Sequence, residues 1–279
     1  MRTLVFGARG YLAGYFLQAM DGAEGSTADI ADADQVAGEL QRHDPDVVIN
    51  CAGKTGRPNV DWCEFNKPET LRSNVTGPLV LLEQCLERKV FLVQMSTGCL
   101  YTGDNGGEGF SEEDEPNFLG SYYVRTKASA ERLLAEFPVL ILRPRMPMDG
   151  SLNPRNLIIK LSKYSRVINE PNSLTYVPDL MAAAQTLIAQ RATGLFNVVN
   201  TGAVSPLEIV QRYQEIVDRS HEFTEISLSE LSRIIEAGRS NCILSNSKLL
   251  GQGIEMRNVD EVLQESLTSI ASQMNSPAK

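Results

Sequence analysis

The sequence predicts a doubly wound α/β fold of the Rossmann type, in which helices cover both faces of a parallel sheet. Short runs of β-branched and apolar residues alternate with longer amphipathic stretches over the first half of the chain. Because these runs are continuously apolar rather than alternating, each strand is expected to be buried on both faces. A glycine-rich turn between the first run and the first amphipathic stretch favours the same fold.

The predicted elements follow one another in strand–helix order. The apolar runs predict strands at residues 4–6, 47–50, 91–96, 139–142, 175–177 and 195–199. The amphipathic stretches predict helices at residues 11–20, 35–42, 68–88, 179–190, 206–217 and 229–236. Residues 103–120 are rich in Gly, Asp, Glu and Asn, which predicts a surface loop or flap. We expect one sheet core from residues 1–150, completed by about 174–200, and a small C-terminal cap from residues 151–173 and 201–279.

Composition argues against several classes of protein. The chain has 279 residues, with 26 Lys and Arg against 35 Asp and Glu, and a net charge of −9 argues against binding nucleic acid. No apolar run reaches the roughly 18 residues that span a bilayer, so we expect no membrane association. Residues 1–2 lead directly into a predicted strand, so no signal peptide is expected. The five cysteines are odd in number and lack CxxC pairing, which predicts a cytoplasmic protein without a disulfide framework or metal site.

The glycine-rich turn predicts a dinucleotide site. Residues 7–13 read GARGYLA, with the spacing GxxGxxA. Glycines permit the tight turn, and the helix N-terminus offers free N–H groups and partial positive charge to a pyrophosphate. Alone the motif is weak, because glycine turns between a strand and a helix are common. The predicted cofactor-binding residues are Gly7, Arg9, Gly10, Tyr11 and Leu12.

Two positions bear on the choice of cofactor. Arg9 lies inside the glycine turn, where its guanidinium can meet a ribose 2′-phosphate or remain in solvent. No acidic residue clearly ends a second strand; Asp29, followed by Ile30, is the candidate, and it can instead touch adenine or cap the next helix. These features favour NADPH, with NADH as the alternative.

A Tyr–Lys pair supplies the candidate acid. Tyr123 and Lys127 form YxxxK in a predicted helix, and residues four apart share one face. A neighbouring ammonium lowers the pKa of a tyrosine from its usual value of about 10, so that the phenol can exchange protons near neutral pH. Thr97 follows a strand predicted one strand–helix unit earlier, and its hydroxyl can hydrogen-bond the same carbonyl oxygen. A surface Tyr–Lys pair is the alternative interpretation.

Together these features resemble the extended short-chain dehydrogenases/reductases. The motifs occur in that family's order: the glycine turn, Cys51-Ala52-Gly53, Asn74, Thr97, Tyr123 and Lys127. The resemblance implies that Lys127 tunes the tyrosine and holds the nicotinamide ribose, and that Asn74 supports Lys127 through a water. It also implies that the cofactor is lined by Cys51, Ala52, Gly53 and Lys54.

Further segments resemble the reductase part of plant rhamnose synthases and, more distantly, bacterial dTDP-4-dehydrorhamnose reductase and GDP-fucose synthase. These segments are residues 53–64 (GKTGRPNVDWCE), 96–99 (STGC), 145–147 (RMP), 153–156 (NPRN) and 239–241 (RSN). The resemblance implies NADPH-dependent reduction, at carbon 4, of a 4-keto-6-deoxy sugar linked to UDP, dTDP or GDP. It assigns NADP(H) to the sheet core and the sugar nucleotide to the cap, and it leaves a homodimer open.

A nucleotide diphosphate needs local cations in a chain of negative net charge. The shared segments contain Lys54, Arg57, Arg155 and Arg239, each of which can also be an ordinary surface charge. Arg239 is expected to bind the diphosphate. Arg57 is a further expected substrate-binding residue, and Asn156 is expected to hold the nucleotide or sugar side of the substrate.

The same resemblance implies inversion of carbons 3 and 5, because the bifunctional members of the family perform it in the reductase site. Cys99 occupies their cysteine position, two residues after Thr97, and is the expected base. Neither His43 nor His221 lies in a matching segment, so Lys160, where the plant enzymes also carry lysine, is the expected acid. The alternative is that Cys99 packs the strand end and Lys160 is a solvated helix residue.

Three other functions stay open. They are a reductase without epimerase activity, a sugar-nucleotide dehydratase or 4-epimerase with tightly held NAD, and a non-catalytic NADP(H)-sensing protein. Dehydratases of this family carry Asp-Glu beside the catalytic threonine, where this chain has Gly98-Cys99. The intact Thr97, Tyr123 and Lys127 argue against a sensor.

Overall fold

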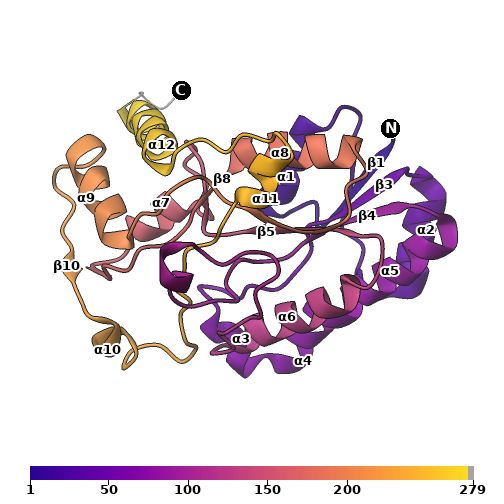
Figure 1. Ribbon diagram of the computed structural model, residues 1–279, viewed down its shortest axis with the longest axis horizontal. Helices are drawn as coiled ribbons and strands as arrows, with labels where there is room; N and C mark the ends of the chain where they lie inside the picture. The colour runs from indigo at the N-terminus through magenta and orange to yellow at the C-terminus, as the bar shows by residue number, and fades with distance from the viewer. Residues whose placement is uncertain (276–279) are drawn as a thin grey trace.

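The computed structural model describes residues 1–275 and contains a six-stranded, wholly parallel sheet (Figure 1). In spatial order its strands are β2 (Glu24–Ser26), β1 (Thr3–Phe6), β3 (Val47–Asn50), β4 (Phe91–Met95), β5 (Leu140–Pro144) and β9 (Gly194–Val198). The order reverses between β1 and β3, and ligands bind beyond the carboxyl ends of parallel strands at such a switch point. The predicted doubly wound fold is confirmed. The sequence analysis did not predict β2, a short strand whose first two residues are exposed.

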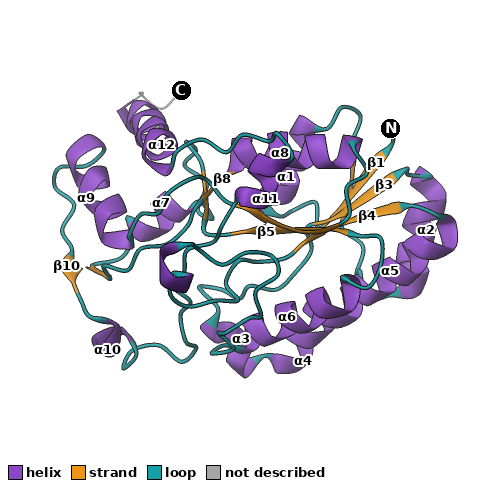
Figure 2. Cartoon of the chain, viewed as in Figure 1, coloured by secondary structure: helices purple, strands orange, loops and turns teal. Residues whose placement is uncertain are grey.

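Helices cover both faces of the sheet, as Figure 2 shows. One face carries α1 (Tyr11–Ala19), α8 (Val177–Ala189) and α11 (Ser247–Gly251), and the other carries α2 (Ala33–His43), α5 (Gly77–Arg88) and α6 (Tyr122–Leu134). Within β1, Val5 packs in the core that contains Phe16 of α1, whereas Leu4 and Phe6 pack in the core that contains Leu81 of α5. This burial on both faces explains why the strand is continuously apolar.

The helix predicted at residues 68–88 is interrupted. A short helix, α4 (Lys67–Leu71), continues through a π-helical turn, η1 (Arg72–Thr76), into α5. Such turns often lie at functional sites. Asn74 lies in η1 and is buried.

A second apolar core lies beyond the left end of the sheet in Figure 1. It is built from β6 (Pro147–Met148), α7 (Leu157–Leu161), β8 (Thr175–Tyr176), α9 (Pro206–Ile216) and α12 (Val259–Asn275). The helix predicted at 206–217 is confirmed as α9, whereas the one predicted at 229–236 is only the short α10 (Leu228–Leu231). The strand predicted at 175–177 pairs with β6 outside the main sheet, and β7 (Arg166–Val167) pairs with β10 (Thr224–Glu225).

Part of the segment expected in the cap covers the sheet instead. Leu249, Ile254 and Met256 belong to the apolar core beneath α1 and α8. The chain then enters α12, which packs on α9.

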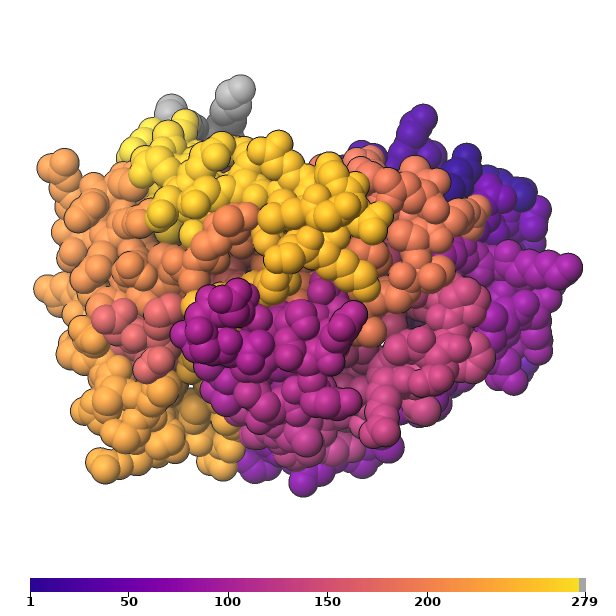
Figure 3. Space-filling view, viewed as in Figure 1, coloured from indigo at the N-terminus to yellow at the C-terminus, as the bar shows by residue number. Residues whose placement is uncertain are grey.

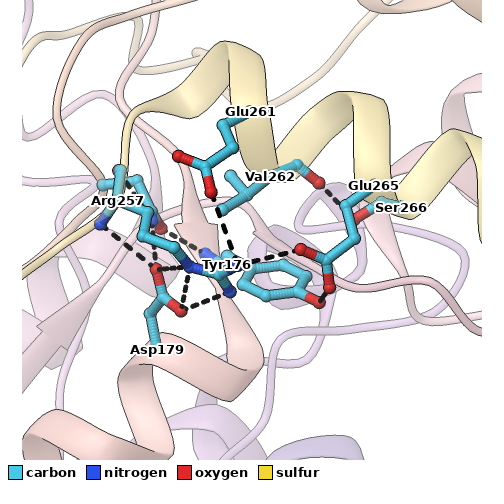
Figure 4. A network of polar contacts seen from close by, with 8 residues as sticks. Tyr176, Asp179, Arg257, Glu261, Val262, Glu265 and Ser266 are labelled. Carbon is cyan, nitrogen blue, oxygen red and sulfur yellow. Dashed lines mark hydrogen bonds and ion pairs between the residues drawn. The ribbon is translucent and has the colours of Figure 1, made fainter.

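Arg257 joins these two parts of the molecule (Figure 4). Its guanidinium forms ion pairs of 2.7 Å with Asp179 in the first turn of α8 and of 2.8 Å with Glu265 of α12. It also lies 5.0 Å from the ring centroid of Tyr176. The hydrogen bonds to Asp179 raise the pKa of Arg257, so the guanidinium stays charged. Arg257 thereby ties the helix that covers the sheet to the C-terminal helix.

The glycine-rich segment after β4 is anchored to the C-terminal third of the chain. The amide of Gly103 donates to the carbonyl of Asn241 at 2.9 Å, and the amide of Phe110 donates to that of Ile243 at 2.9 Å. Phe110 is buried and stacks on Tyr101. In Figure 3 the magenta atoms of this segment lie on the surface beside yellow C-terminal atoms. Residues 102–108 are exposed as predicted, but the segment is not a free flap.

No helix among residues 1–275 is long and apolar enough to cross a membrane.

Candidate active site

The glycine turn contacts the turn after β3 at the switch point of the sheet. Gly7 has a φ of 77°, and a Cβ there would lie 2.7 Å from the backbone nitrogen of Ala52. A Cβ on Gly10 would lie 2.9 Å from the carbonyl oxygen of Gly7. Gly10 also caps α1 without any side-chain hydrogen bond, so the first amides of the helix remain available to an anion. This cradle fits the pyrophosphate of NADP(H).

The hydroxyl of Tyr11 forms a hydrogen bond within the protein, and its expected contact with the cofactor stays a prediction. Tyr11 and Tyr15 both donate hydrogen bonds to Asp149, which is buried. Burial and these hydrogen bonds raise the pKa of both tyrosines, so they stay protonated donors. The backbone carbonyl of Arg9 accepts a hydrogen bond of 3.1 Å from Arg155, whereas no hydrogen bond or ion pair of the Arg9 side chain occurs within residues 1–275. The glycine turn is therefore tied to the segment after β6, and the guanidinium of Arg9 is free to meet a phosphate.

The side chain of Asp29 pairs with Arg72 and does not cap a helix. The two side chains form an ion pair of 3.0 Å, and hydrogen bonds from the backbone of Ala31 and from Arg72 lower the pKa of Asp29. Asp32 caps α2, which overturns the idea that Asp29 does so. Ile30 is buried in the core beneath α5.

Asn74 binds the backbone of Lys54 and makes no hydrogen bond to Lys127. Its Oδ1 accepts from the amide of Lys54 at 2.7 Å, and its Nδ2 donates to the carbonyl of Lys54 at 2.9 Å and to Oγ1 of Thr126 at 3.2 Å. These contacts satisfy the side-chain amide within the protein, and the expected support of Lys127 through a water stays a prediction. Asn74 instead fixes the turn that follows β3. The ammonium of Lys54 pairs with Glu69 at 2.5 Å.

Thr97, Tyr123 and Lys127 converge beyond the carboxyl end of β4. Thr97 lies two residues after the strand, is almost fully buried, and faces Tyr123 in the first turn of α6. Lys127 lies one turn later and donates to the carbonyl oxygen of Met95 at 2.7 Å. Burial lowers the pKa of Lys127 to about 8.

The predicted lowering of the Tyr123 pKa is wrong for this structure. Burial raises the pKa of Tyr123, a charge on Cys99 raises it further, and the hydrogen bond with Thr97 opposes the rise. The ammonium of Lys127 does not offset the burial because it is itself buried and turned toward a carbonyl. Tyr123 is therefore a protonated phenol, the form that can donate a proton.

A buried ion pair behind these residues was not foreseen from the sequence. Glu131 of α6 accepts hydrogen bonds of 2.6 and 3.0 Å from Arg143 of β5 and one of 2.6 Å from Ser96. Arg143 also donates to the hydroxyl of Tyr101 at 3.1 Å. This network fixes α6 against the ends of β4 and β5.

Cys99 lies against a second buried arginine, which the sequence analysis also missed. Nη1 of Arg145 is 3.2 Å from Sγ of Cys99. Arg145 follows β5 directly and is 1% exposed. Its only sequence signal was its place in the segment RMP, at residues 145–147, which the resemblance singled out.

The structure does not gather the expected substrate-binding residues around Cys99. Arg57 is exposed in the loop after β3, and Arg239 pairs with Asp61 at 2.8 Å. Asn156 is fully buried, caps α7 and donates to Asp149 and Ser151, so its expected substrate role is corrected.

Lys160, the expected acid, lies exposed on α7. No hydrogen bond joins it to Cys99 within the described residues. The surrounding protein and the charge of Arg155 lower the pKa of Lys160.

Comparisons with known proteins identify the family of this chain. The family model described as RmlD substrate binding domain matches residues 1–272. A bifunctional dTDP-4-dehydrorhamnose 3,5-epimerase/dTDP-4-dehydrorhamnose reductase of Arabidopsis thaliana is 38% identical over 272 residues, covering 93% of this chain and 90% of that protein. A trifunctional UDP-glucose 4,6-dehydratase/UDP-4-keto-6-deoxy-D-glucose 3,5-epimerase/UDP-4-keto-L-rhamnose-reductase of the same plant is 38% identical over 94% of this chain, which spans 41% of that longer relative.

Solved structures of similar proteins share the fold of this chain. The UDP-rhamnose synthase of Acanthamoeba polyphaga mimivirus has a TM-score of 0.90 at 30% identity, covering 96% of this chain and 99% of that one. The dTDP-4-dehydrorhamnose reductase of Bacillus anthracis, solved in complex with NADP, shares the fold with a TM-score of 0.81 at 22% identity and 98% coverage of both chains.

The parallel sheet, the glycine cradle and the Thr–Tyr–Lys group define a dinucleotide-binding protein of the short-chain dehydrogenase/reductase type. More narrowly, the chain belongs to the RmlD substrate-binding-domain family. The resemblance drawn from its motifs is thereby confirmed.

We predict that Glu131→Ala lowers the free energy of unfolding by about 3–5 kcal/mol, because it leaves the buried guanidinium of Arg143 without a counter-charge. Asp260→Ala is the control, since it breaks an ion pair of equal length, 2.6 Å, whose side chains are 34% and 65% exposed. The control should cost less than about 1 kcal/mol. Urea unfolding measures both, and equal losses would contradict the role assigned to Glu131.

Proposed function

We propose that this protein catalyses NADPH-dependent reduction of a nucleotide-linked 4-keto-6-deoxyhexose at carbon 4. The observation that carries the proposal is the convergence of Thr97, Tyr123 and Lys127 beside the glycine cradle. A hydroxyl, a protonated phenol and a buried amine at that edge are suited to carbonyl reduction. The activities named for the relatives supply the substrate class.

NADPH, when bound, supplies the hydride that reaches carbon 4. Tyr123 donates its phenolic proton to the carbonyl oxygen as negative charge develops there, and Thr97 donates a hydrogen bond to the same oxygen. Preorganised donors of this kind are each worth about 3 kcal/mol in the transition state. Lys127, which donates a hydrogen bond to the carbonyl of Met95, is the residue proposed to hold the nicotinamide ribose. The free guanidinium of Arg9 favours a cofactor with a 2′-phosphate over NADH.

We further propose that the same site inverts carbons 3 and 5 before reduction. Protons beside a ketone are acidic enough for a modest base to remove, and Cys99 lies two residues from Thr97 and is only partly buried. Lys160 is the proposed acid, because its lowered pKa makes its ammonium a stronger proton donor than an ordinary lysine. Since Lys160 lies on α7 of the second core, this assignment requires the sugar to bridge the sheet and that core.

The remaining substrate contacts are also proposals. Arg239 and Arg57 are the cations proposed for the nucleotide diphosphate, which would compete with Asp61 for Arg239. In this scheme residues 1–150 with 174–200 bind NADP(H), and the second core binds the sugar nucleotide. Both UDP and dTDP fit the activities named for the relatives.

Tyr123→Phe should reduce turnover by roughly 10²–10⁴-fold, because it removes the positioned acid and leaves the ring in place. NADPH binding should be retained, since the glycine cradle is untouched. The control is Tyr122→Phe, which alters the preceding tyrosine, packed against Arg125 rather than Thr97. Oxidation of NADPH, followed by absorbance with the keto sugar nucleotide, measures the rates. Near-normal reduction by the Tyr123 variant would remove this residue from the mechanism.

Epimerisation predicts proton exchange without reduction. When the keto sugar nucleotide is incubated in D₂O without reduced cofactor, the unaltered protein should introduce deuterium at carbons 3 and 5, and Cys99→Ala should not. Cys85→Ala, a buried cysteine on α5, is the control and should exchange normally. Mass spectrometry and NMR locate the deuterium. If the unaltered protein incorporates none yet reduces a substrate already inverted at both carbons, it is a reductase only.

A further inference from the structure

Arg145 is a buried cation without a carboxylate partner. It is the largest fully buried side chain described, and no ion pair to it occurs within residues 1–275. A buried charge is normally paired, because an isolated ion loses most of its solvation free energy on leaving water. Arg145 therefore needs another source of negative charge.

Arg143 is the natural comparison, because it is a buried arginine with a structural role and a carboxylate partner. It lies two residues earlier, is similarly buried at 3% exposure, and forms a bidentate ion pair with Glu131. Arg145 has no equivalent carboxylate. The two guanidinium groups therefore differ in their partners: a carboxylate faces Arg143, and neutral groups and a thiol face Arg145.

The oxygen acceptors around Arg145 are all neutral. Nη2 donates to Oδ1 of Asn172 and to the carbonyl of Ser240 at 2.8 Å, and Nη1 donates to the hydroxyl of Ser240 at 3.2 Å. Nε has no partner among the described residues. These contacts fix the orientation of the guanidinium, and they leave its charge uncompensated.

Cys99 is the one ionisable acid in direct contact with this guanidinium in the described part of the chain, at 3.2 Å. The neighbouring Cys242 has a different partner: its thiol donates a hydrogen bond to the carbonyl of Gly98 at 3.4 Å. Burial raises the pKa of Cys242, which keeps it a thiol. Tyr123, the third titratable group near Cys99, is a protonated phenol.

We propose that Arg145 pairs with Cys99 as a thiolate and so holds this side chain in the form that removes a proton from the sugar. Arg145 is a positioning residue, since it acts through the sulfur. The inference rests on the proposed epimerisation for its use in catalysis, but the ion pair can be tested without any substrate.

The step balances without another reactant. The thiolate takes the proton from carbon 3 or 5, so an S–H bond forms as the C–H bond breaks, and the electron pair moves to give an enolate. The enolate oxygen is the former 4-keto oxygen, which faces Thr97 and Tyr123 in the proposed pose. Lys160, the proposed acid, returns a proton to the opposite face of the same carbon, and proton exchange with solvent water restores the thiolate and the ammonium. A negative sulfur also raises the pKa of Tyr123, so the phenol keeps its proton for the later reduction.

The test is the rate at which iodoacetamide alkylates Cys99 at pH 7.0 and pH 9.5, with the labelled peptide quantified by mass spectrometry. An ordinary thiol, with a pKa of about 8.5, gains about thirty-fold over this range because only ~3% is thiolate at the lower pH. A thiolate already paired with Arg145 should gain less than about threefold. Limited access to the sulfur cancels in the ratio of the two rates. The same peptide in the urea-unfolded chain is the internal control, and its alkylation rate at pH 9.5 should be about thirty times its rate at pH 7.0.

Variants assign the effect to Arg145. In Arg145→Met, which keeps an unbranched stem without charge, the ratio should rise to about thirty, and Arg145→Lys should give a smaller ratio than Arg145→Met. A purely structural role would alter the melting temperature or the absolute rates and leave the ratio unchanged. If Arg145→Met does not fold, the ratio in the unaltered protein still decides.

A ratio near thirty in the folded, unaltered protein overturns the inference. If deuterium exchange nevertheless occurs, the proposed epimerase stands and only the ion pair is wrong. If the ratio is small and the unaltered protein exchanges no deuterium, the ion pair stands and the epimerase proposal fails. If the ratio is small and the unaltered protein also exchanges deuterium, both proposals stand. Arg145→Met should then exchange deuterium at least about tenfold more slowly at pH 7.0 and recover toward the normal rate at pH 9.5.

Discussion

The site depends on the close approach of the chain segments that leave β4 and β5, which Gly98 makes feasible. The amide of Gly98 donates to the carbonyl of Pro144 at 2.9 Å. A Cβ at this position would lie 2.5 Å from the side chain of Leu244 and 3.2 Å from that of Arg145. Any larger residue would therefore displace the stem of Arg145 or the C-terminal segment that covers it. An acidic side chain of the dehydratase type has no space here.

Because these segments lie close together, one loop carries two side chains with different proposed roles. Thr97 faces Tyr123 on α6, whereas Cys99, two residues on, faces the guanidinium that follows β5. Burial and a nearby cation act in opposite directions on acids. Tyr123 is kept as a proton donor by burial, and we propose that Cys99 is kept as a base by Arg145. Two acids with opposite protonation in one site are what sequential proton abstraction and carbonyl reduction require.

The sequence predicts the parts of this molecule that depend on local pattern. Mostly apolar runs identify β1, β3, β4, β5 and β9, because a strand buried on both faces carries apolar residues on each of them. The glycine turn and YxxxK are likewise readable, since each needs residues close together in the chain. The spacing of Val259, Val262, Leu263 and Leu267 was also sufficient to predict α12, although the sequence analysis did not use it.

What could not be predicted is which distant polar group each side chain meets. Asn74 binds the backbone of Lys54, 20 residues away, and Arg145 meets Cys99 across 46 residues. These partners are set by the ends of neighbouring strands, and the sequence carries no periodic signal for them. Asn156 looked like a substrate ligand for the same reason, because its burial and its bonds to Asp149 are known only once the chain is folded.

The most direct test of this account is the structure of the product formed from UDP- or dTDP-4-keto-6-deoxyglucose with NADPH in D₂O, determined by NMR. If one site performs proton abstraction and reduction, the product is the L-rhamnose nucleotide, with deuterium at carbons 3 and 5 and protium from NADPH at carbon 4. A 6-deoxyhexose nucleotide with unchanged configuration and no deuterium at carbons 3 and 5, or the absence of NADPH oxidation with either substrate, would contradict it.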